Sequence, residues 1–402
     1  MRDEPNARAI LAAVLAVFFA FMGIGVVDPI LPVIADEMGA APWETEMLFT
    51  SYLAIMAVAM LFVAPIPTRI GSRRTMLFAL AGVVVFAGIC GLISEIWPLA
   101  IARGGWGLSN AFFTPTALAL ILLLAPSTSR AVTFFEAGLG LGIACGPLLG
   151  GFLGGISYHL PFFGTPALVL IGLIATLIWV KEPARREQPQ PVRAVFRPFS
   201  NAPFVIVSIC GMLYYYSYFT VLTYSPLFLH LDTVTLGLIF FGWGVMVAIG
   251  SVWLVNRLQI IMKPTTLLIA SLAVMVVSLG IIIAVDSLPL RIALLVLIGL
   301  PSGVCNAVYT VLSVDVSPHV RSVSTGAYNF LRWIGSAFAP VLSGILSAVT
   351  PVMPYEVAAV LVVICAVVLF LSGSRINRAQ AEATALRVQA ARNQEPAAAA
   401  AQ

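Results

Sequence analysis

The sequence predicts an all-α integral membrane protein in which twelve transmembrane helices form two six-helix bundles with pseudo-two-fold symmetry. Two observations concern composition: 60% of the 402 residues are hydrophobic, and only 9% are charged. Soluble globular domains carry about 25% charged residues, so most of this protein is expected to lie in lipid. The third observation is that the second half of the chain repeats motifs of the first half.

A transmembrane helix needs about 20 apolar residues, and hydropathy divides the chain into twelve such spans. The spans lie near residues 9–34, 45–66, 75–95, 98–125, 132–157, 162–180, 203–228, 235–256, 265–285, 290–313, 323–349 and 355–373. The first span is too long for a cleaved secretory signal and is expected to be retained. This topology puts all 21 Lys and Arg, except Arg103, Arg291 and Arg332, on one side. Positive loops stay in the cytoplasm, so both termini are predicted to be cytoplasmic.

Two groups of residues recur between the halves. Gly107-Leu-Ser-Asn-Ala-Phe-Phe-Thr114 returns as Gly303-Val-Cys-Asn-Ala-Val-Tyr-Thr310, and Gly142, Pro147 and Gly151 return as Gly335, Pro340 and Gly344. The predicted domains are an N-terminal bundle at 1–180, a polar cytoplasmic linker at 181–202, a C-terminal bundle at 203–376 and a cytoplasmic tail at 377–402, which is expected to be disordered or, alternatively, a frayed amphipathic helix. Parallel repeats of this kind build transporters whose substrate cavity lies between the bundles and opens to alternate sides.

Residues 138–151 form a glycine ladder that ends in Gly-Pro. Small residues let membrane helices approach closely, and proline removes a backbone donor where a helix bends, so we expect a packing seam between moving helices. The ladder resembles the fifth-helix antiporter motif gxxxGPxxGG of the major facilitator superfamily. It is matched by Gly142, Gly146, Pro147, Gly150 and Gly151. Within the superfamily the chain is similar to the twelve-helix drug:proton antiporters, including their aromatic-compound and drug exporter branch.

Four ionisable residues are predicted inside the spans: Asp28, Arg103, Glu136 and Arg332. A charge at the bilayer centre costs about 2.5–3.5 kcal/mol on insertion scales, so each needs a partner or a wet cavity. Asp28 and Arg103 share a depth, and we expect them to face one another or to share the cavity. A nearby guanidinium favours the carboxylate whereas burial favours the neutral acid, so Asp28 is the predicted exchangeable proton site. A static ion pair is the alternative.

Glu136 and Arg332 have more than one interpretation. Glu136 lies one turn inside the cytoplasmic end of span five, where the helix N-terminus favours an acid. It either has this structural role, pairs with a gate arginine, or is a second proton or cation site. Arg332 lies deeper, in span eleven, and either attracts an anionic substrate or pairs with Glu136.

Three further segments resemble motifs of the family. Arg103 occupies the arginine of the fourth-helix motif RxxQGxg, although Trp106 replaces its Gln, and Asp28-Pro-Ile-Leu-Pro32 resembles the end of the first-helix pattern, with a bend expected at its prolines. The loop 64–74 resembles the signature loop Gly-x-x-x-Asp-Arg-x-Gly-x-Arg-Arg. It is matched by Arg69, Gly71, Arg73 and Arg74. Ala64 and Thr68 replace the Gly and the Asp, so we expect a weaker cytoplasmic gate or an acid supplied from elsewhere. The positive-inside rule would also explain these arginines.

Aromatic and amide side chains are expected to line the substrate cavity. The candidates are Asn110, Phe113, Tyr215, Tyr218, Asn306, Tyr309 and Arg332. Aromatic faces suit flat lipophilic or cationic ligands through stacking and cation–π attraction. Packing and interface anchoring are the alternative roles for the aromatics, and hydrogen bonding between helices is the alternative for the asparagines.

The predicted function is proton-coupled export of small lipophilic or aromatic compounds by alternating access, of the multidrug type, in the bacterial inner membrane. The chain has no Walker motif, so the proton gradient is the expected energy source and no cofactor is required. No metal or enzyme constellation is found, and the net charge of +4 reflects topology rather than nucleic-acid binding. A monomer surrounded by lipid is expected because one chain supplies both bundles. Alternatives are a metabolite exporter or importer, a lipid flippase, a facilitator without proton coupling, and a non-transporting membrane sensor.

Overall fold

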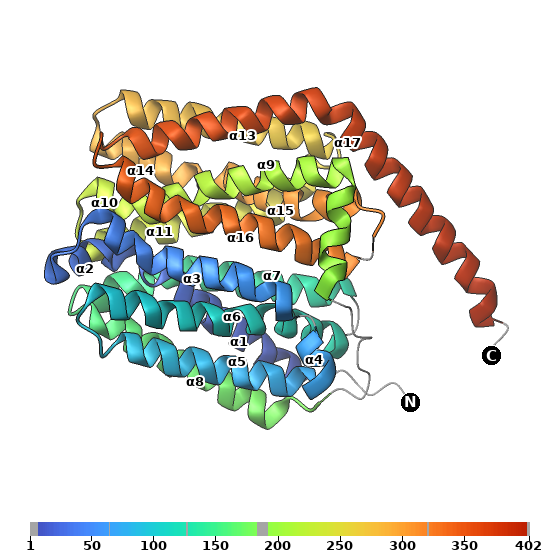
Figure 1. The fold of residues 1–402 in the computed structure, drawn as a ribbon, viewed down its shortest axis with the longest axis horizontal. Helices are drawn as coiled ribbons and strands as arrows, with labels where there is room; N and C mark the ends of the chain where they lie inside the picture. Colours follow the sequence, from blue (N-terminus) through green and yellow to red (C-terminus); the bar gives the residue numbers. More distant parts are fainter. Residues whose placement is uncertain (1–6, 64, 126–127, 183–191, 320, 400–402) are drawn as a thin grey trace.

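The computed structural model describes residues 7–63, 65–125, 128–182, 192–319 and 321–399. These ranges contain helices and short connections, and the helices run side by side in two bundles (Figure 1). Both chain ends lie at the same end of the bundles, which we call the terminal end; the opposite end is the distal end. Within the described ranges, eleven helical segments are long and apolar enough to cross a membrane. The predicted all-α membrane fold is confirmed.

The first bundle contains six crossings. Its elements are α1 (Ala7–Gly25), η1 (Asp28–Ile30), α2 (Leu31–Met38), α3 (Pro42–Val63), α4 (Pro65–Ile70), α5 (Ser72–Cys90), α6 (Ile96–Leu124), α7 (Thr128–Gly154) and α8 (His159–Trp179). The first crossing is broken at η1, a single 3₁₀ turn that starts at Asp28. Pro29 has no backbone N–H and Pro32 follows in the first turn of α2, so the α-helical ladder is interrupted here. The helix is thus interrupted at the two prolines, where the sequence predicts a bend.

The second bundle repeats the six crossings. Its elements are α9 (Ala202–Phe219), η3 (Thr220–Tyr224), α10 (Ser225–Leu229), α11 (Thr233–Ala248), η4 (Ile249–Leu254), α12 (Val255–Leu258), α13 (Pro264–Ala284), α14 (Leu288–Leu297), α15 (Gly299–Asp315), α16 (Arg321–Leu346) and α17 (Met353–Ala399). Both η3 and η4 are π-helical turns inside longer helices. Such turns add one residue to the helix and often mark functional sites. The remaining predicted crossing, α16, has 26 residues.

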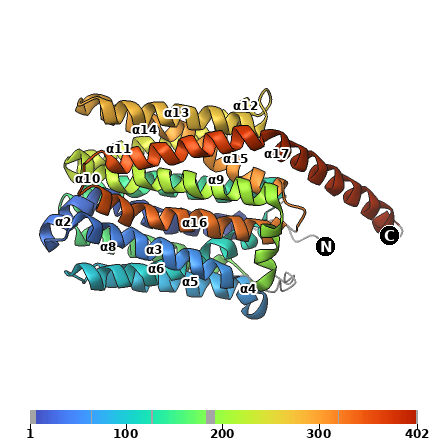
Figure 2. The same ribbon diagram turned by 45° about the horizontal axis from the view of Figure 1, so that its top comes forward.

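Two helix pairs join the bundles. α3 packs along α16, and α7 packs along α11. At the distal end, α10 also contacts α2, and η1 contacts α11. At the terminal end, the short helix η2 (Val192–Ser200) packs against α16, α3 and α9 (Figure 2). The bundles therefore touch at both ends, and the rest of the predicted linker, 183–191, lies outside the described residues.

The chain does not become irregular after residue 376. α17 continues as a single helix to Ala399 and projects past the other helices at the terminal end (Figure 1). Of the two expectations for the tail, disorder and a helix, the structure has the helix over residues 377–399. Ala, Arg, Gln and Glu, which dominate this stretch, are among the strongest helix formers, so their local preference extends the last transmembrane helix beyond the bundle.

Candidate functional site

Asp28 lies at the break between α1 and α2, where the two bundles meet. Its side chain is fully buried, and neither carboxyl oxygen has a hydrogen-bond partner. Arg103 of α6 and Tyr218 of α9 lie within electrostatic range of this carboxyl. A charge on Asp28 would therefore interact electrostatically with residues of both bundles.

Arg103 is held by aromatic rings. The centre of its guanidinium lies 4.7 Å from the ring centroid of Tyr52, 4.8 Å from that of Trp106 and 5.6 Å from that of Phe49. The Nε atom donates to the carbonyl of Leu48 at 3.4 Å, and neither Nη atom has a hydrogen-bond partner. Ring faces attract a cation most strongly where water is excluded, and Arg103 is fully buried. Trp106, which departs from the family motif, thus contributes directly to the environment of the arginine.

Asp28 and Arg103 do not form a direct ion pair, since both oxygens of Asp28 lack a hydrogen-bond partner. Arg103 lies within electrostatic range of Asp28, and the predicted sharing of one cavity stays a prediction. The two groups therefore interact through space, and the strength of this interaction depends on how far the surrounding helices separate them.

Glu46 is a buried acid that the sequence interpretation missed. It lies one turn into α3, is fully buried and has no hydrogen-bond partner for either carboxyl oxygen. Asp28 lies within electrostatic range of it. The structure therefore places two buried carboxyl groups, rather than one, near the distal ends of their helices.

Arg332 of α16 is an internal arginine of the second bundle. Its guanidinium lies 5.0 Å from the ring centroid of Tyr215, 5.1 Å from that of Trp333 and 5.8 Å from that of Tyr328. One Nη atom donates to the hydroxyl of Thr310 at 3.3 Å. Each bundle thus holds an internal arginine that is surrounded by aromatic rings.

Aromatic rings fill the region next to Arg332. Tyr215 and Tyr218 lie 5.7 Å apart, Tyr218 lies 5.1 Å from Trp243, and Tyr215 lies 6.3 Å from Trp333, all between ring centroids. Asn306 accepts a hydrogen bond from the hydroxyl of Tyr214 at 3.0 Å. These contacts join α9, α11, α15 and α16 into one aromatic cluster.

Three other predicted cavity residues have structural contacts. Tyr309 is fully buried inside the second bundle and stacks on Tyr214, with 5.5 Å between the ring centroids. Asn110 donates to the hydroxyl of Tyr52, which also faces Arg103, and Phe113 is fully buried on α6. Tyr309 thus packs within a bundle, whereas Asn110 supports the ring cluster around Arg103.

The glycine ladder of α7 has two faces. A Cβ added at Gly142, Gly146 or Gly150 would meet the backbone of the first crossing, within the same bundle. Gly151 and the carbonyl of Pro147 instead lie next to Gly237 on α11 of the other bundle, while the ring of Pro147 lies against Gly25 of the first crossing. Residues four apart lie on one face of a helix, which explains why the first three glycines share a partner. The ladder therefore joins α7 to its own bundle and, on its other face, to the second bundle.

The arginine-rich loop at the terminal end contacts the end of α8. Oxygens of Glu182 accept hydrogen bonds from the backbone N–H of Arg73 at 3.2 Å and of Arg74 at 3.3 Å. Arg73 also donates from its guanidinium to the carbonyls of Val180 and Leu177. Glu182 thus supplies a negative charge at the N-terminus of α5, where backbone N–H groups and the helix dipole favour an anion.

Some predicted groups lie outside the described part of the chain. These are Ala64 and the side chains of Thr68 and Glu136. Arg69 is exposed, and Gly71 adopts a φ of +100°. The predicted pairing of Glu136 with Arg332 therefore stays a prediction.

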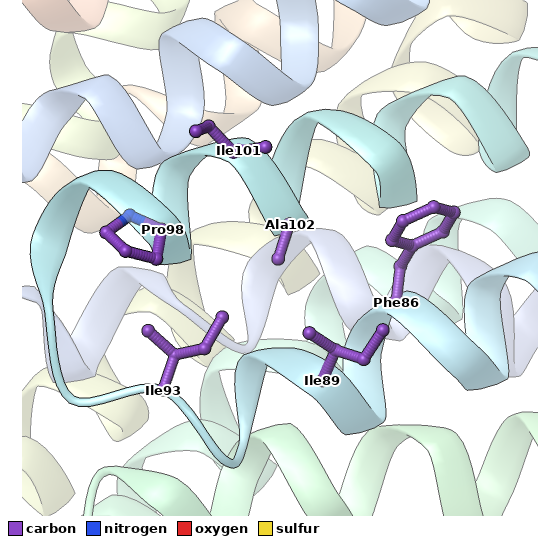
Figure 3. Close-up of a pocket in the computed structure, with 6 residues that line it drawn as sticks. All are labelled: Phe86, Ile89, Ile93, Pro98, Ile101 and Ala102. Atoms are coloured by element: carbon purple, nitrogen blue, oxygen red, sulfur yellow. The ribbon is translucent and has the colours of Figure 1, made fainter.

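A separate apolar hollow of about 320 Å³ lies between α5 and α6 (Figure 3). Its lining residues are Phe86, Ile89, Ile93, Pro98, Ile101 and Ala102. No charged or polar side chain is among these residues, and Ile101 is 76% exposed. The hollow belongs to the apolar outer surface of the first bundle and is separate from the buried charges.

Two pseudo-symmetric six-helix bundles in one membrane-spanning chain, with buried charges near their contact, define a secondary transporter. The chain belongs to the Major Facilitator Superfamily, whose sequence profile matches residues 13–340. It is 38% identical to the multidrug efflux protein YfmO of Bacillus subtilis (strain 168) over 369 residues, which cover 90% of this chain and 93% of that protein. It is 30% identical to the class B tetracycline resistance protein of Escherichia coli over 184 residues, 44% of this chain and 45% of that protein.

Solved structures share the fold. A point mutant of the nucleoside transporter NupG aligns with a TM-score of 0.75 at 13% identity, covering 92% of this chain and 99% of that chain. An inward-facing, unoccupied bacterial homologue of the human lysosomal transporter Spinster aligns with a TM-score of 0.72 at 16% identity, covering 94% of this chain and 98% of that chain. At these identities the likeness concerns the fold alone.

Proposed function

We propose that this protein is a drug-efflux transporter of the bacterial inner membrane that exchanges small lipophilic or aromatic compounds for inward-moving protons. The alignment with a multidrug efflux protein over 90% of the chain supports the substrate class. A tetracycline resistance protein, matched over 44% of the chain, supports the direction of transport. One chain supplies both bundles, so the monomer is the proposed working unit.

The observation that carries the proton coupling is Asp28. An ionised carboxylate without a hydrogen-bond partner is very costly to bury, whereas a neutral carboxyl costs far less. Asp28 is buried without such a partner, and it lies at the break in the first crossing where both bundles approach it. A movement that opens this region to water would allow Asp28 to ionise, and reclosure would require a proton.

The distribution of positive charge supports the orientation. Arg69, Arg73, Arg74, Arg193 and Arg197 lie in α4, the start of α5 and η2, all at the terminal end. Lys and Arg are enriched in cytoplasmic loops, so the terminal end is proposed to face the cytoplasm and the distal end the exterior. In this orientation both termini are cytoplasmic.

The aromatic cluster is the proposed substrate-binding region. Tyr215, Tyr218, Trp243 and Trp333 present several ring faces between helices α9, α11 and α16. Flat apolar compounds gain from stacking on such rings without needing a fixed pattern of hydrogen bonds. This chemistry suits a transporter that accepts many lipophilic compounds.

The entry of one proton down its gradient releases enough free energy for such an exchange. A unit charge moving through 100 mV releases about 2.3 kcal/mol, enough to hold roughly a 50-fold gradient of a neutral substrate. One titrating carboxyl per cycle would therefore support efflux.

Dye transport tests the proposal. Purified protein in proteoliposomes should move ethidium against its gradient when a pH gradient is imposed, and Asp28→Asn should abolish the gradient-driven component. Asp36→Asn is the matched control, since Asp36 is an exposed acid on the adjoining α2. Undiminished gradient-driven flux in Asp28→Asn would exclude Asp28 from coupling. Absence of gradient-driven flux for any dye in the unaltered protein would reject multidrug antiport and favour a dedicated metabolite or lipid exporter.

A further inference from the structure

Glu46 has no role in the function proposed above, and its surroundings differ from those of a structural acid. Structural acids near helix N-termini usually accept backbone hydrogen bonds or face water. The nearby Glu44 does so, because its carboxyl accepts a hydrogen bond from the N–H of Ala41 at 2.9 Å. Glu46 is fully buried and accepts no hydrogen bond.

The groups that face Glu46 come from three other elements. Thr223 and Tyr224 belong to the π-helical turn η3, and Tyr355 belongs to α17. Asp28 of η1 lies within electrostatic range. None of these four groups is cationic, so a charge on Glu46 would lack compensation and would be repelled by an ionised Asp28.

The tyrosines next to Glu46 already have hydrogen-bond partners in the second bundle. Tyr224 donates its hydroxyl to the carbonyl of Pro351 at 2.7 Å, and Tyr355 shares a hydrogen bond with Ser225 at 2.7 Å. The only basic side chain of the neighbouring α6, Arg103, is surrounded by Phe49, Tyr52 and Trp106. Among the described groups around Glu46, only the neutral Thr223 hydroxyl favours the ionised carboxylate, and none of the four neighbouring groups named above is a cation that would compensate its charge in this conformation.

This carboxyl lies where the bundles close against each other at the distal end. Three residues before it, Trp43 packs so closely on Gly344 of α16 that a Cβ there would meet the α3 backbone. One turn after it, Thr50 accepts a hydrogen bond from the backbone N–H of Val341 at 3.3 Å. Glu46 is thus enclosed by contacts between α3 of the first bundle and α16, η3 and α17 of the second.

We propose that Glu46 is a second proton-binding site, which must be neutral for α3 to close against the second bundle at the distal end. When the distal end opens, water reaches the carboxyl and it releases its proton to that water. The carboxylate then opposes closure until a proton from the exterior binds one of its oxygens. This inference rests on the proton-coupled transport proposed above, and it adds a pH-dependent control of the distal gate.

The equilibrium between the closed and the open distal end can be measured without a transport assay. Spin labels on Glu37→Cys and Val349→Cys, both exposed at the distal ends of the two bundles, report the distance between the bundles in a background free of the five native cysteines. In the otherwise unaltered protein, the long-distance population should grow from acidic to alkaline pH. Asp28 would contribute a pH response of the same sign, so the variants are compared in an Asp28→Asn background. There, Glu46→Gln, which cannot ionise, should reduce this growth at least about fivefold.

Two matched variants make the result interpretable. Glu46→Asp keeps a titratable group and should restore most of the pH response, whereas Glu356→Gln removes an exposed acid at the same end and should leave it unchanged. A normal pH response in Glu46→Gln, no pH response in the unaltered protein, or failure of Glu46→Asp to restore the response would each overturn the inference.

A different observation would reject the proposed transport function. Absence of gradient-driven dye efflux in the unaltered protein would reject multidrug antiport. Gradient-driven efflux that survives alongside a normal pH response in Glu46→Gln would reject only the role of Glu46.

Discussion

Gly151 of α7 and Gly237 of α11 leave no room between them for a side chain. A Cβ on Gly151 would lie 2.9 Å from the Cα of Gly237, and a Cβ on Gly237 would lie 3.0 Å from the Cα of Gly151. The same helix pair stays close further along, where a Cβ on Gly244 would lie 2.7 Å from the Cα of Ala144. The bundles therefore meet backbone to backbone along this pair, and small residues make the contact possible.

A bulky residue in this contact should separate the bundles. We expect Gly151→Leu to lower dye efflux at least about tenfold, because the closed contact is needed once in each cycle and its loss by more than about 1.4 kcal/mol shifts the equilibrium that far. Gly140→Leu is the control on the same helix, since nothing lies within 4 Å of a Cβ there. Efflux by equal amounts of each reconstituted variant is the measurement. Full activity in Gly151→Leu would show that this contact is dispensable.

Lysine at position 103 should not support normal transport. The planar guanidinium stacks on several rings at once, whereas an ammonium group is more strongly hydrated and does not stack. We expect Arg103→Lys to lower gradient-driven efflux about tenfold, because the loss of one such interaction is worth roughly 1–2 kcal/mol when it is desolvated. Arg193→Lys, an exposed arginine on η2, provides the comparison and should transport normally. Equal rates in the two variants would contradict a role for the ring cluster.

Tyr218 should influence substrate affinity through its ring rather than its hydroxyl. Tyr218→Leu is expected to raise the KM for an aromatic dye by about 2- to 12-fold, the range that an aromatic pair of about 0.5–1.5 kcal/mol corresponds to. Tyr218→Phe keeps the ring and should leave KM close to its original value. Initial efflux rates over a range of dye concentrations measure this difference. An equal rise in both variants would assign the effect to the hydroxyl.

Gly71 and Gly39 should respond differently to alanine. Gly71 has a φ of +100°, and an added Cβ would lie 2.6 Å from the carboxyl of Glu182. Gly39 has a φ of +59°, and its Cβ would meet nothing within 4 Å. Gly39→Ala should lose about 1 kcal/mol of stability, the usual cost of a left-handed residue, and Gly71→Ala should lose more. Apparent Tm values of the two variants in one detergent compare them; a smaller loss in Gly71→Ala would refute the close contact.

The spans and the break at Asp28 could be predicted from sequence because they depend on local properties. About twenty apolar residues fit a bilayer whatever surrounds them, and Pro29 interrupts a helix through its own missing N–H. The similar depths of Asp28 and Arg103 along two helices likewise predict that they interact, and Arg103 lies within electrostatic range of Asp28. Only part of the ring cluster around Arg103 could be predicted from the sequence. Trp106 is on the same helix as Arg103, but Phe49 and Tyr52 come from α3.

Glu46 was missed because an acid near the end of a span normally faces headgroups or water. Its burial depends on residues of η3 and α17, which belong to the other half of the chain, and no local pattern reports their approach. A signal does exist in the sequence: Glu44 already occupies the capping position, so a second acid two residues later has no local partner. The tail after residue 376 was left open between a helix and disorder for another reason, because composition alone does not separate a helix in water from an irregular tail.

The rings around the two internal arginines have a consequence for how the chain is made. Synthesis proceeds from the N-terminus, so α3, with Phe49 and Tyr52, reaches the bilayer before α6 delivers Arg103. Tyr215 on α9 likewise precedes Arg332, while other rings arrive on the same helix as that arginine. Each costly charge thus enters lipid only after part of its ring environment is already inserted. Exchanging the order of the helices would leave the final contacts unchanged but would deliver each arginine to lipid before its rings, which predicts inefficient insertion of such a permuted chain.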